Sequence, residues 1–288
     1  MKECVIVGGG LNAMLTAREL VKEGVDVIVL EKGDVGREAS WAGGGILSPL
    51  YPWRYSDAVT ELALWSQRVY PELVSMLCED TNIDPEWTSS GLLILGQDEL
   101  VDVQAWGERY HVKFHVLDSE QTRNIEPALG SATKSIWLPH IAQVRNPRFL
   151  QALKKYLEQN GVTLREGYTV SELIVKSGRV QGVIAAGERI KAERVILAAG
   201  AWTSQLMGNS AIKINVFPVR GQMILFRARA EMLTRIVLSQ GHYVIPRRDG
   251  RVLAGSTLEY VGFDKSTTND AYETLRTAAL DIIPGLAD

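Results

Sequence analysis

The residues best suited to chemistry stand near the start of the chain, in the spacing Gly8-x-Gly10-x-x-Ala13. Gly8 permits a tight turn, and Gly10 lets the backbone approach a pyrophosphate without a Cβ in the way. Ala13 is small enough for a following helix to pack on the preceding strand. The N-terminus of that helix offers unpaired N–H groups and a positive dipole end to phosphates. The spacing therefore predicts a dinucleotide-binding site.

The elements around this motif support the prediction. The apolar run Cys4–Val7 predicts a strand before it, and a helical pattern follows until Gly24. A second buried strand, Val25–Leu30, ends at Glu31, at the distance where an acidic residue accepts hydrogen bonds from ribose hydroxyls. This context disfavours a purely structural glycine turn. NAD and FAD share the unit, so the motif alone does not choose between them.

Helical and hairpin patterns alternate along the rest of the chain. A helix is predicted from Ser56, and another from Asn146 to Gln159, with Asn146 as its cap. The apolar face of the first of these helices comprises Ala58, Leu62, Trp65 and Val69. Strands are predicted at Leu92–Leu95, Leu173–Val175, Val180–Ile184, Arg194–Ala198, Tyr243–Ile245 and Val252–Ala254. The alternation predicts two domains that the chain visits in turn.

Composition limits the classes of partner. The 288 residues are 46% hydrophobic and 23% charged, with a net charge of −3, so no basic field is available to grip nucleic acid. The two cysteines, Cys4 and Cys78, suit a reducing compartment. No targeting segment is visible, and no apolar run approaches the ~20 residues that span a bilayer. We therefore expect a cytoplasmic protein without a transmembrane segment.

Residues 36–49 read Gly-Arg-Glu-Ala-Ser-Trp-Ala-Gly-Gly-Gly-Ile-Leu-Ser-Pro, a composition-unusual stretch. It resembles the D-amino-acid oxidase-like family of FAD-dependent oxidoreductases. The continuation over residues 50–55, Leu-Tyr-Pro-Trp-Arg-Tyr, resembles the proteobacterial glycine oxidases of thiamine biosynthesis within that family. Residues 194–203, 217–222 and 243–247 resemble the family's second FAD-side strand, its Pro-x-Arg/Lys-Gly element and its active-site strand. The resemblance thus covers essentially the whole chain.

The resemblance implies an α/β fold, with a Rossmann-like FAD-binding domain and an antiparallel-sheet substrate domain. The FAD-binding domain is expected over residues 1–78 and 146–216, and the substrate domain over residues 79–145 and 217–288. The implied cofactor-binding residues are Gly8, Gly10, Leu11, Asn12, Ala13, Glu31, Lys32, Ala39, Ser40, Gly44, Gly45, Ile46, Val170 and Gly200. Tyr243 is implied as the catalytic residue that orients the substrate carboxylate. If Glu31 serves the ribose, Glu31→Ala should weaken FAD binding and leave the stability of the apoprotein little changed.

The implied reaction is oxidative deamination of glycine and small amines, including sarcosine and small D-amino acids. Its products are the imine or 2-oxo acid, ammonia and hydrogen peroxide, and the imine of glycine would supply thiamine thiazole synthesis. One alternative is an FAD-dependent D-amino-acid dehydrogenase that passes electrons to a quinone. Another is a truncated flavin-binding remnant without turnover. The expected partners are a small amino acid or amine, dioxygen, and further copies of the chain in a homo-oligomer.

For several other residues, we prefer a structural role to a functional one. His111 and His115 are four residues apart in a stretch that predicts a strand, and without a third ligand they predict no metal site. Arg247 and Arg248 beside a hairpin turn predict a solvated pair rather than an anion clamp. Trp53 and Tyr55 suit either gating of a pocket or core packing.

The resemblance also implies a segment beyond Pro284–Leu286 that carries an arginine for the substrate carboxylate and a glycine-rich turn under the flavin. The sequence ends at Asp288, so neither element is assigned. A helix with an apolar face precedes this point, and we expect that face to be exposed for lack of its partner. The face comprises Ala271, Leu275, Ala278 and Ile282.

Overall fold

A computed structural model describes residues 2–96, 98–207 and 214–287, and the chain divides into two compact units. The first unit comprises Met1–Gly43, Val74–Pro85 and Asn146–Pro218, and the second comprises Gly44–Leu73, Glu86–Arg145 and Val219–Asp288. The chain therefore passes from one unit to the other five times. Helix α3 (Asp57–Thr81) contributes to both units. The predicted α/β class is confirmed, and residues 44–73, expected with the first domain, group with the second unit.

A six-stranded sheet in the order β6-β2-β1-β9-β8-β7 forms the first unit. Its strands are β1 (Lys2–Val7), β2 (Val27–Leu30), β6 (Thr163–Arg165), β7 (Val170–Lys176), β8 (Arg179–Ala185) and β9 (Glu188–Leu197). β6, β2, β1 and β9 run parallel, whereas β9, β8 and β7 form an antiparallel meander. β1 thus lies between β2, which follows it in the chain, and β9, which comes about 180 residues later. The strand order reverses at β1, which is where open α/β sheets bind ligands.

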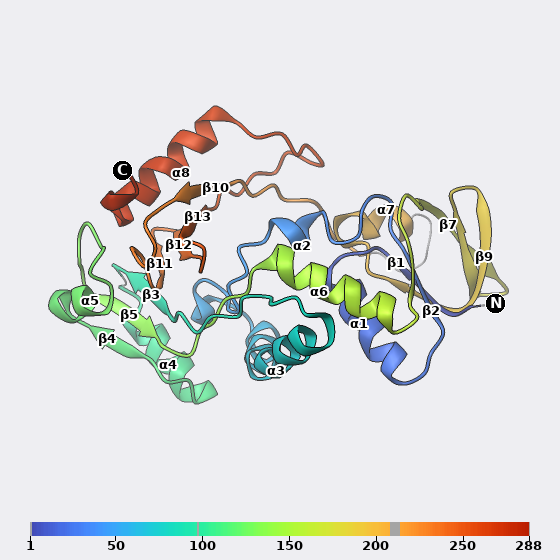
Figure 1. Cartoon of the computed structure of the whole chain (residues 1–288), viewed down its shortest axis with the longest axis horizontal. Coiled ribbons are helices and arrows are strands. Elements are labelled where there is room, and N and C mark those ends of the chain that lie inside the picture. The colour runs from blue at the N-terminus through green and yellow to red at the C-terminus, as the bar shows by residue number, and fades with distance from the viewer. Residues whose placement is uncertain (1, 97, 208–213, 288) are drawn as a thin grey trace. The chain divides into compact units, whose positions relative to one another are not determined.

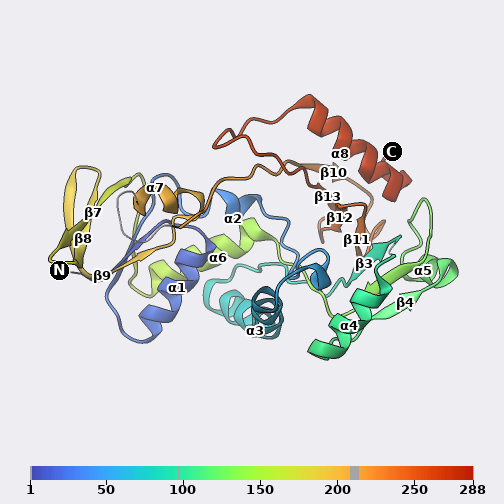
Figure 2. The same ribbon diagram turned by 180° about the vertical axis from the view of Figure 1, so that it is seen from behind.

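Helices cover the parallel part of this sheet. The helices of the first unit are α1 (Leu11–Lys22), α2 (Ala39–Ala42), α6 (Asn146–Gln159), α7 (Thr203–Met207) and the 3₁₀ turn η2 (Gly200–Trp202). α1 and α6 lie side by side (Figures 1 and 2). The run Cys4–Val7 is almost completely buried, at 3% exposure or less, as expected for a parallel strand without a solvent face.

The second unit contains a seven-stranded sheet in the order β10-β13-β12-β11-β3-β5-β4. Its strands are β3 (Leu92–Leu95), β4 (His115–Leu117), β5 (Ser135–Leu138), β10 (Met223–Arg227), β11 (Ile236–Ser239), β12 (His242–Pro246) and β13 (Arg251–Gly255). The predicted hairpin of β12 and β13 is confirmed. The sheet is antiparallel except where β11 pairs with β3, which is a parallel pair.

Different elements cover the two faces of this sheet. The helices of the second unit are α4 (Leu100–Tyr110), α5 (Ser119–Ile125), α8 (Asn269–Ile282) and the 3₁₀ turns η1 (Pro52–Arg54) and η3 (Pro284–Ala287). α8 packs on β10, β12 and β13 (Figure 1). Val244 of β12 belongs to the same core cluster as Ala279 and Ile282 of α8. Tyr243 and Ile245, on the alternate side of β12, join a second cluster with α4 and with Ile46.

Two expectations about helix faces are wrong. The face of α8 expected to be exposed is buried against the sheet, with Ala279 in place of Ala278 as its third member. In α3 the predicted apolar face is turned outward instead, with Leu62 68% and Trp65 57% exposed. The helix buries Thr60 on another side, so tertiary packing overrides its apolar periodicity. Within the described residues, every helix is too short or too polar to span a bilayer.

Candidate functional site

The turn between β1 and α1 accepts glycine only. Gly8 has φ +105°, and its N–H donates to Leu30 O at 2.8 Å. A Cβ on Gly8 would lie 2.4 Å from Ala198 O, which is closer than real side chains approach. The residue is therefore required by its backbone conformation and by the approach of the neighbouring chain.

The first turn of α1 presents an unopposed positive dipole end. Gly10 caps the helix without a side-chain hydrogen bond, and no acidic residue stands in the first turn. Ala13 is fully buried on the sheet, whereas Asn12 is exposed. The Leu11 N–H donates to Ser40 Oγ at 2.9 Å, which joins α2 to the start of α1. This end of the helix fits a diphosphate chemically, because backbone N–H groups and the dipole both favour an anion.

Glu31 is buried beside this turn, and its carboxylate binds backbone. Oε2 accepts the Gly9 N–H at 2.6 Å, and Oε1 accepts the Gly33 N–H at 2.9 Å. The expectation that loss of Glu31 would leave the stability of the apoprotein unaffected therefore lacks support, since two N–H groups of the site depend on this carboxylate. Ribose hydroxyls remain a predicted additional partner.

The other residues predicted for the adenosine end follow neighbouring strands. The Lys32 ammonium lies 3.2 Å from the centre of the Trp202 ring, a cation–π contact in the turn that begins at Gly200. Gly200 has φ +52°. Val170 begins β7, two residues after Tyr168, whose N–H donates to Glu31 O at 2.8 Å. Lys32, Tyr168 and Gly200 thus lie at the carboxyl ends of the parallel strands β2, β6 and β9, whereas Val170 begins the antiparallel meander.

Asn146, predicted only as a helix cap, anchors the short helix α2. Its Nδ2 donates to Ser40 O at 2.9 Å. A Cβ on Gly43 would lie 2.6 Å from the same nitrogen, so this glycine allows the approach. Ala39 is exposed and opens the short helix α2. In the first unit the structure therefore brings Ser40, one of the predicted cofactor-binding residues, to the start of α1 beside the glycine turn.

In the second unit, Tyr243 stands beside Gly44. The Tyr243 side chain is buried at 8% exposure, and burial raises the pKa of its phenol, so the hydroxyl keeps its proton at neutral pH. The hydroxyl lies 3.3 Å from Met223 Sδ. Thioether sulfur is a weak acceptor, so a carboxylate oxygen would be a stronger partner for this proton.

Gly44, Gly45 and Ile46 form an extended loop paired with the segment around Gln143. Gly45, at φ +77°, accepts the Val144 N–H through its carbonyl at 2.9 Å, and Ile46 forms a β-bridge with Gln143. Backbone hydrogen bonds, and not side chains of the loop, therefore hold this loop in place.

Arg247 corrects the expectation of a solvated arginine pair. Its guanidinium donates to Gln143 Oε1 at 2.6 Å, to Val144 O at 3.2 Å and to Gly44 O at 2.7 Å. Burial lowers its pKa to about 10, which leaves it charged at neutral pH. Arg248 is exposed and donates to backbone at Trp87. No sequence signal distinguished the two arginines, because their partners lie more than a hundred residues away.

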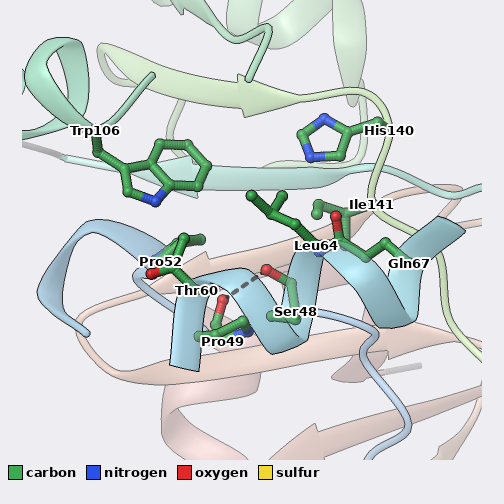
Figure 3. A pocket seen from close by; sticks show the side chains of 10 residues that line it. Ser48, Pro49, Pro52, Thr60, Leu64, Gln67, Trp106, His140 and Ile141 are labelled. Atoms are coloured by element: carbon green, nitrogen blue, oxygen red, sulfur yellow. Dashed lines mark hydrogen bonds between the residues drawn. The ribbon is translucent and has the colours of Figure 1, made fainter. Parts of the chain in front are cut away.

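A small cavity in the second unit is lined by α3, α4 and the segment at His140 (Figure 3). Its volume of about 10 Å³ suits one water molecule and is too small for an amino acid. Thr60 Oγ1 and Trp106 Nε1 are buried there without a hydrogen-bond partner among the described residues. Burial lowers the pKa of His140, so its imidazole is neutral. Trp53 packs edge-on against Trp106, which favours core packing over gating.

The prediction that His111 and His115 lie in one strand is wrong. His111 is the left-handed C-cap of α4, and His115 begins β4. Among residues 2–96, 98–207 and 214–287, no group of three or more His, Cys, Asp and Glu side chains could hold a metal ion.

Comparison with known proteins adds independent evidence. A family model described as FAD dependent oxidoreductase (DAO) matches residues 3–288. The glycine oxidase of Pseudomonas aeruginosa is 44% identical over 286 residues, which are 99% of this chain and 79% of that protein. The bifunctional protein ThiO/ThiG of Trichormus variabilis is 30% identical over 100% of this chain and 44% of its own length. The crystal structure of glycine oxidase from Geobacillus kaustophilus superposes with a TM-score of 0.93 at 27% identity, covering 99% of this chain and 79% of that one.

Proposed function

The chain belongs to the FAD-dependent oxidoreductase (DAO) family, and on that premise we propose that it catalyses the oxidative deamination of glycine and related small amines. It is an FAD-dependent oxidoreductase of the glycine oxidase type, and its cofactor is FAD. The glycine turn at the carboxyl end of β1 is the observation that carries the assignment of a dinucleotide site, and the family match selects FAD as the dinucleotide. The substrate is inferred from the similarity to glycine oxidase.

FAD would supply the redox chemistry when bound, since it accepts the two electrons of a carbon–hydrogen bond next to an amine nitrogen. The proposed reaction takes two electrons and two protons from glycine to give its imine, and water converts the imine to the 2-oxo acid and ammonia. Dioxygen receives the electrons and protons as hydrogen peroxide. No strong protein base is needed if the substrate carbon is held near the flavin.

The chain's own residues would hold the two reactants. Gly8, Gly10 and the start of α1 would bind the diphosphate, and Glu31 would keep the turn in place while it accepts ribose hydroxyls. Tyr243, with its proton retained, would donate to the substrate carboxylate in place of Met223 Sδ. The similarity to ThiO/ThiG supports a thiamine-related role, and we infer that the imine of glycine would feed thiazole synthesis.

The proposal is tested with purified protein supplied with FAD. Acid denaturation should release free yellow flavin, and glycine, sarcosine and D-alanine should each drive peroxide formation in air. A flavin that remains on the chain, or a preference for NAD, would contradict the cofactor proposal. Reduction of the flavin by substrate with reoxidation by a quinone but not by oxygen would indicate a dehydrogenase. Bound FAD without reduction by any of these amines would indicate a flavin-binding protein without turnover. Light scattering tests the expected homo-oligomer.

A further inference from the structure

Arg247 connects the predicted flavin loop to the strand that carries Tyr243. We propose that Arg247 is a positioning residue that fixes the loop Gly44–Ile46 against β12. The inference rests on the proposed function only in assigning this loop to the flavin. The hydrogen bonds themselves are a property of the second unit alone.

Side chains of β12 and of the residue after it crowd the backbone at Gly44. Tyr243, Ile245 and Arg247 alternate along the chain and therefore project to one side. A Cβ on Gly44 would lie 3.0 Å from Ile245 Cδ1 and 3.4 Å from the Tyr243 hydroxyl. Arg247 Nη2 donates to the carbonyl of the same glycine at 2.7 Å. Three side chains of one strand segment thus meet a single loop residue.

Arg247 also binds the segment that pairs with the loop. Arg247 Nη1 donates to Gln143 Oε1 and to Val144 O. That segment is itself bound to the loop, because the Val144 N–H donates to Gly45 O and the Leu47 N–H donates to Ala142 O, each at 2.9 Å. The guanidinium therefore binds both paired segments, the loop at Gly44 and the segment at Gln143 and Val144. Lysine cannot reproduce this, since it lacks a planar fork with donors at fixed separation.

The carboxylates Glu86 and Asp249 act on Arg247 through space, but its hydrogen bonds within the described residues go to oxygen atoms of neutral groups. The nearby carboxylates Glu86 and Asp249 are both bound by Arg145, at 3.2 and 2.9 Å. Arg247 directs its donors to two carbonyls and an amide oxygen instead. An arginine bonded in this way sets the geometry of neutral backbone rather than neutralising an acid.

The decisive experiment compares Arg247→Met and Arg247→Lys with Arg227→Met, which removes an exposed arginine from β10 of the same sheet. Hydrogen exchange is measured on the protein without added FAD. The amides of Leu47 and Val144 should exchange at least tenfold faster in Arg247→Met and less so in Arg247→Lys. They should be unchanged in Arg227→Met. The lysine variant keeps the charge and alkyl stem, so it serves if the methionine variant does not fold. Unchanged exchange in a folded Arg247 variant would overturn the proposal.

The FAD-loaded proteins separate this inference from the proposed function. Both Arg247 variants should shift the visible circular dichroism of the flavin and raise KM for glycine, whereas Tyr243→Phe should raise KM with a normal flavin spectrum. Faster loop exchange with an unaltered flavin spectrum would overturn the assignment of the loop to the flavin. Faster exchange in a protein whose wild-type form does not oxidise glycine would refute the proposed function and leave the role of Arg247 in place.

Discussion

Replacing Glu31 with alanine should destabilise the cofactor unit even in the absence of FAD. The change removes a buried bond from the Gly9 N–H at 2.6 Å and a partly buried bond from the Gly33 N–H at 2.9 Å. A hydrogen bond to a charged group contributes about 1.5–3 kcal/mol. With the partly buried bond at the lower end of that range, the local loss is roughly 3–4.5 kcal/mol.

Hydrogen exchange over residues 8–14 is the appropriate assay, because a protein of two units need not unfold in a single step. The exposed carboxylate of Glu3 provides a matched control, since it accepts the Asp26 N–H at 2.7 Å next to the same sheet. Glu3→Ala should lower the local opening free energy by less than about 1 kcal/mol. Glu31→Gln keeps the shape and one acceptor oxygen, so its effect should lie between those of Glu3→Ala and Glu31→Ala.

FAD affinity gives the second measurement. If a ribose hydroxyl also bonds to this carboxylate, Glu31→Ala should weaken FAD binding on the order of 10- to 100-fold. If Glu31→Ala binds FAD more weakly but its amides over residues 8–14 exchange at the wild-type rate, the claim that Glu31 holds the turn is refuted. Unchanged FAD affinity with faster exchange would instead refute the ribose contact.

Three further outcomes are expected. Tyr243→Phe should raise KM for glycine roughly 10- to 100-fold by removing one bond to a charged carboxylate, and steady-state kinetics with an unaltered flavin absorption spectrum would support this. The pKa of Glu259 is lowered to about 2, first by its hydrogen bond from Arg220, so its contribution to stability is present above about 4.5 and is lost as the pH falls toward 2. Urea midpoints of Glu259→Gln should therefore depend less on pH in that window than wild-type midpoints, and equal slopes would contradict the pairing. Thr60→Val should lower stability by about 1–2 kcal/mol if water in the adjoining cavity bonds the hydroxyl, and an equal or higher urea midpoint would exclude that bond.

Local patterns in the sequence were sufficient to predict the glycine turn after β1 and the hairpin of β12 and β13. Gly8 and Ala13 were predictable because a strand, a tight turn and a helix in succession leave few residue types allowed at those positions. The hairpin at Asp249–Gly250 is similarly encoded by adjacent residues, and β12 and β13 pair there. These features depend on neighbours in the chain, which is what sequence patterns report.

Features that depend on distant partners were missed. Arg247 and Arg248 look alike in sequence, and only the arrival of Gly44 and Gln143 distinguishes them. The face of α3 was misassigned because Leu62 and Trp65 repeat at helical spacing, yet the fold buries another side of the helix. Glu31 was predicted for its ligand, while its bonds to Gly9 and Gly33 could be seen only once the turn was folded.

The position of β1 between β2 and β9 also determines when its hydrogen-bond ladders can form during synthesis of the chain. Lys2 pairs with Ala192 and Val7 with Leu197, so β1 cannot complete its ladder until β9, about 185 residues later in the chain, has left the ribosome. At about 5–20 residues per second, that wait is roughly 10–40 s. During that wait, one edge of the apolar run Cys4–Val7 has no partner, which is the situation in which strands pair wrongly or recruit chaperones. The site at the end of β1 is therefore assembled long after β1 itself has been synthesised.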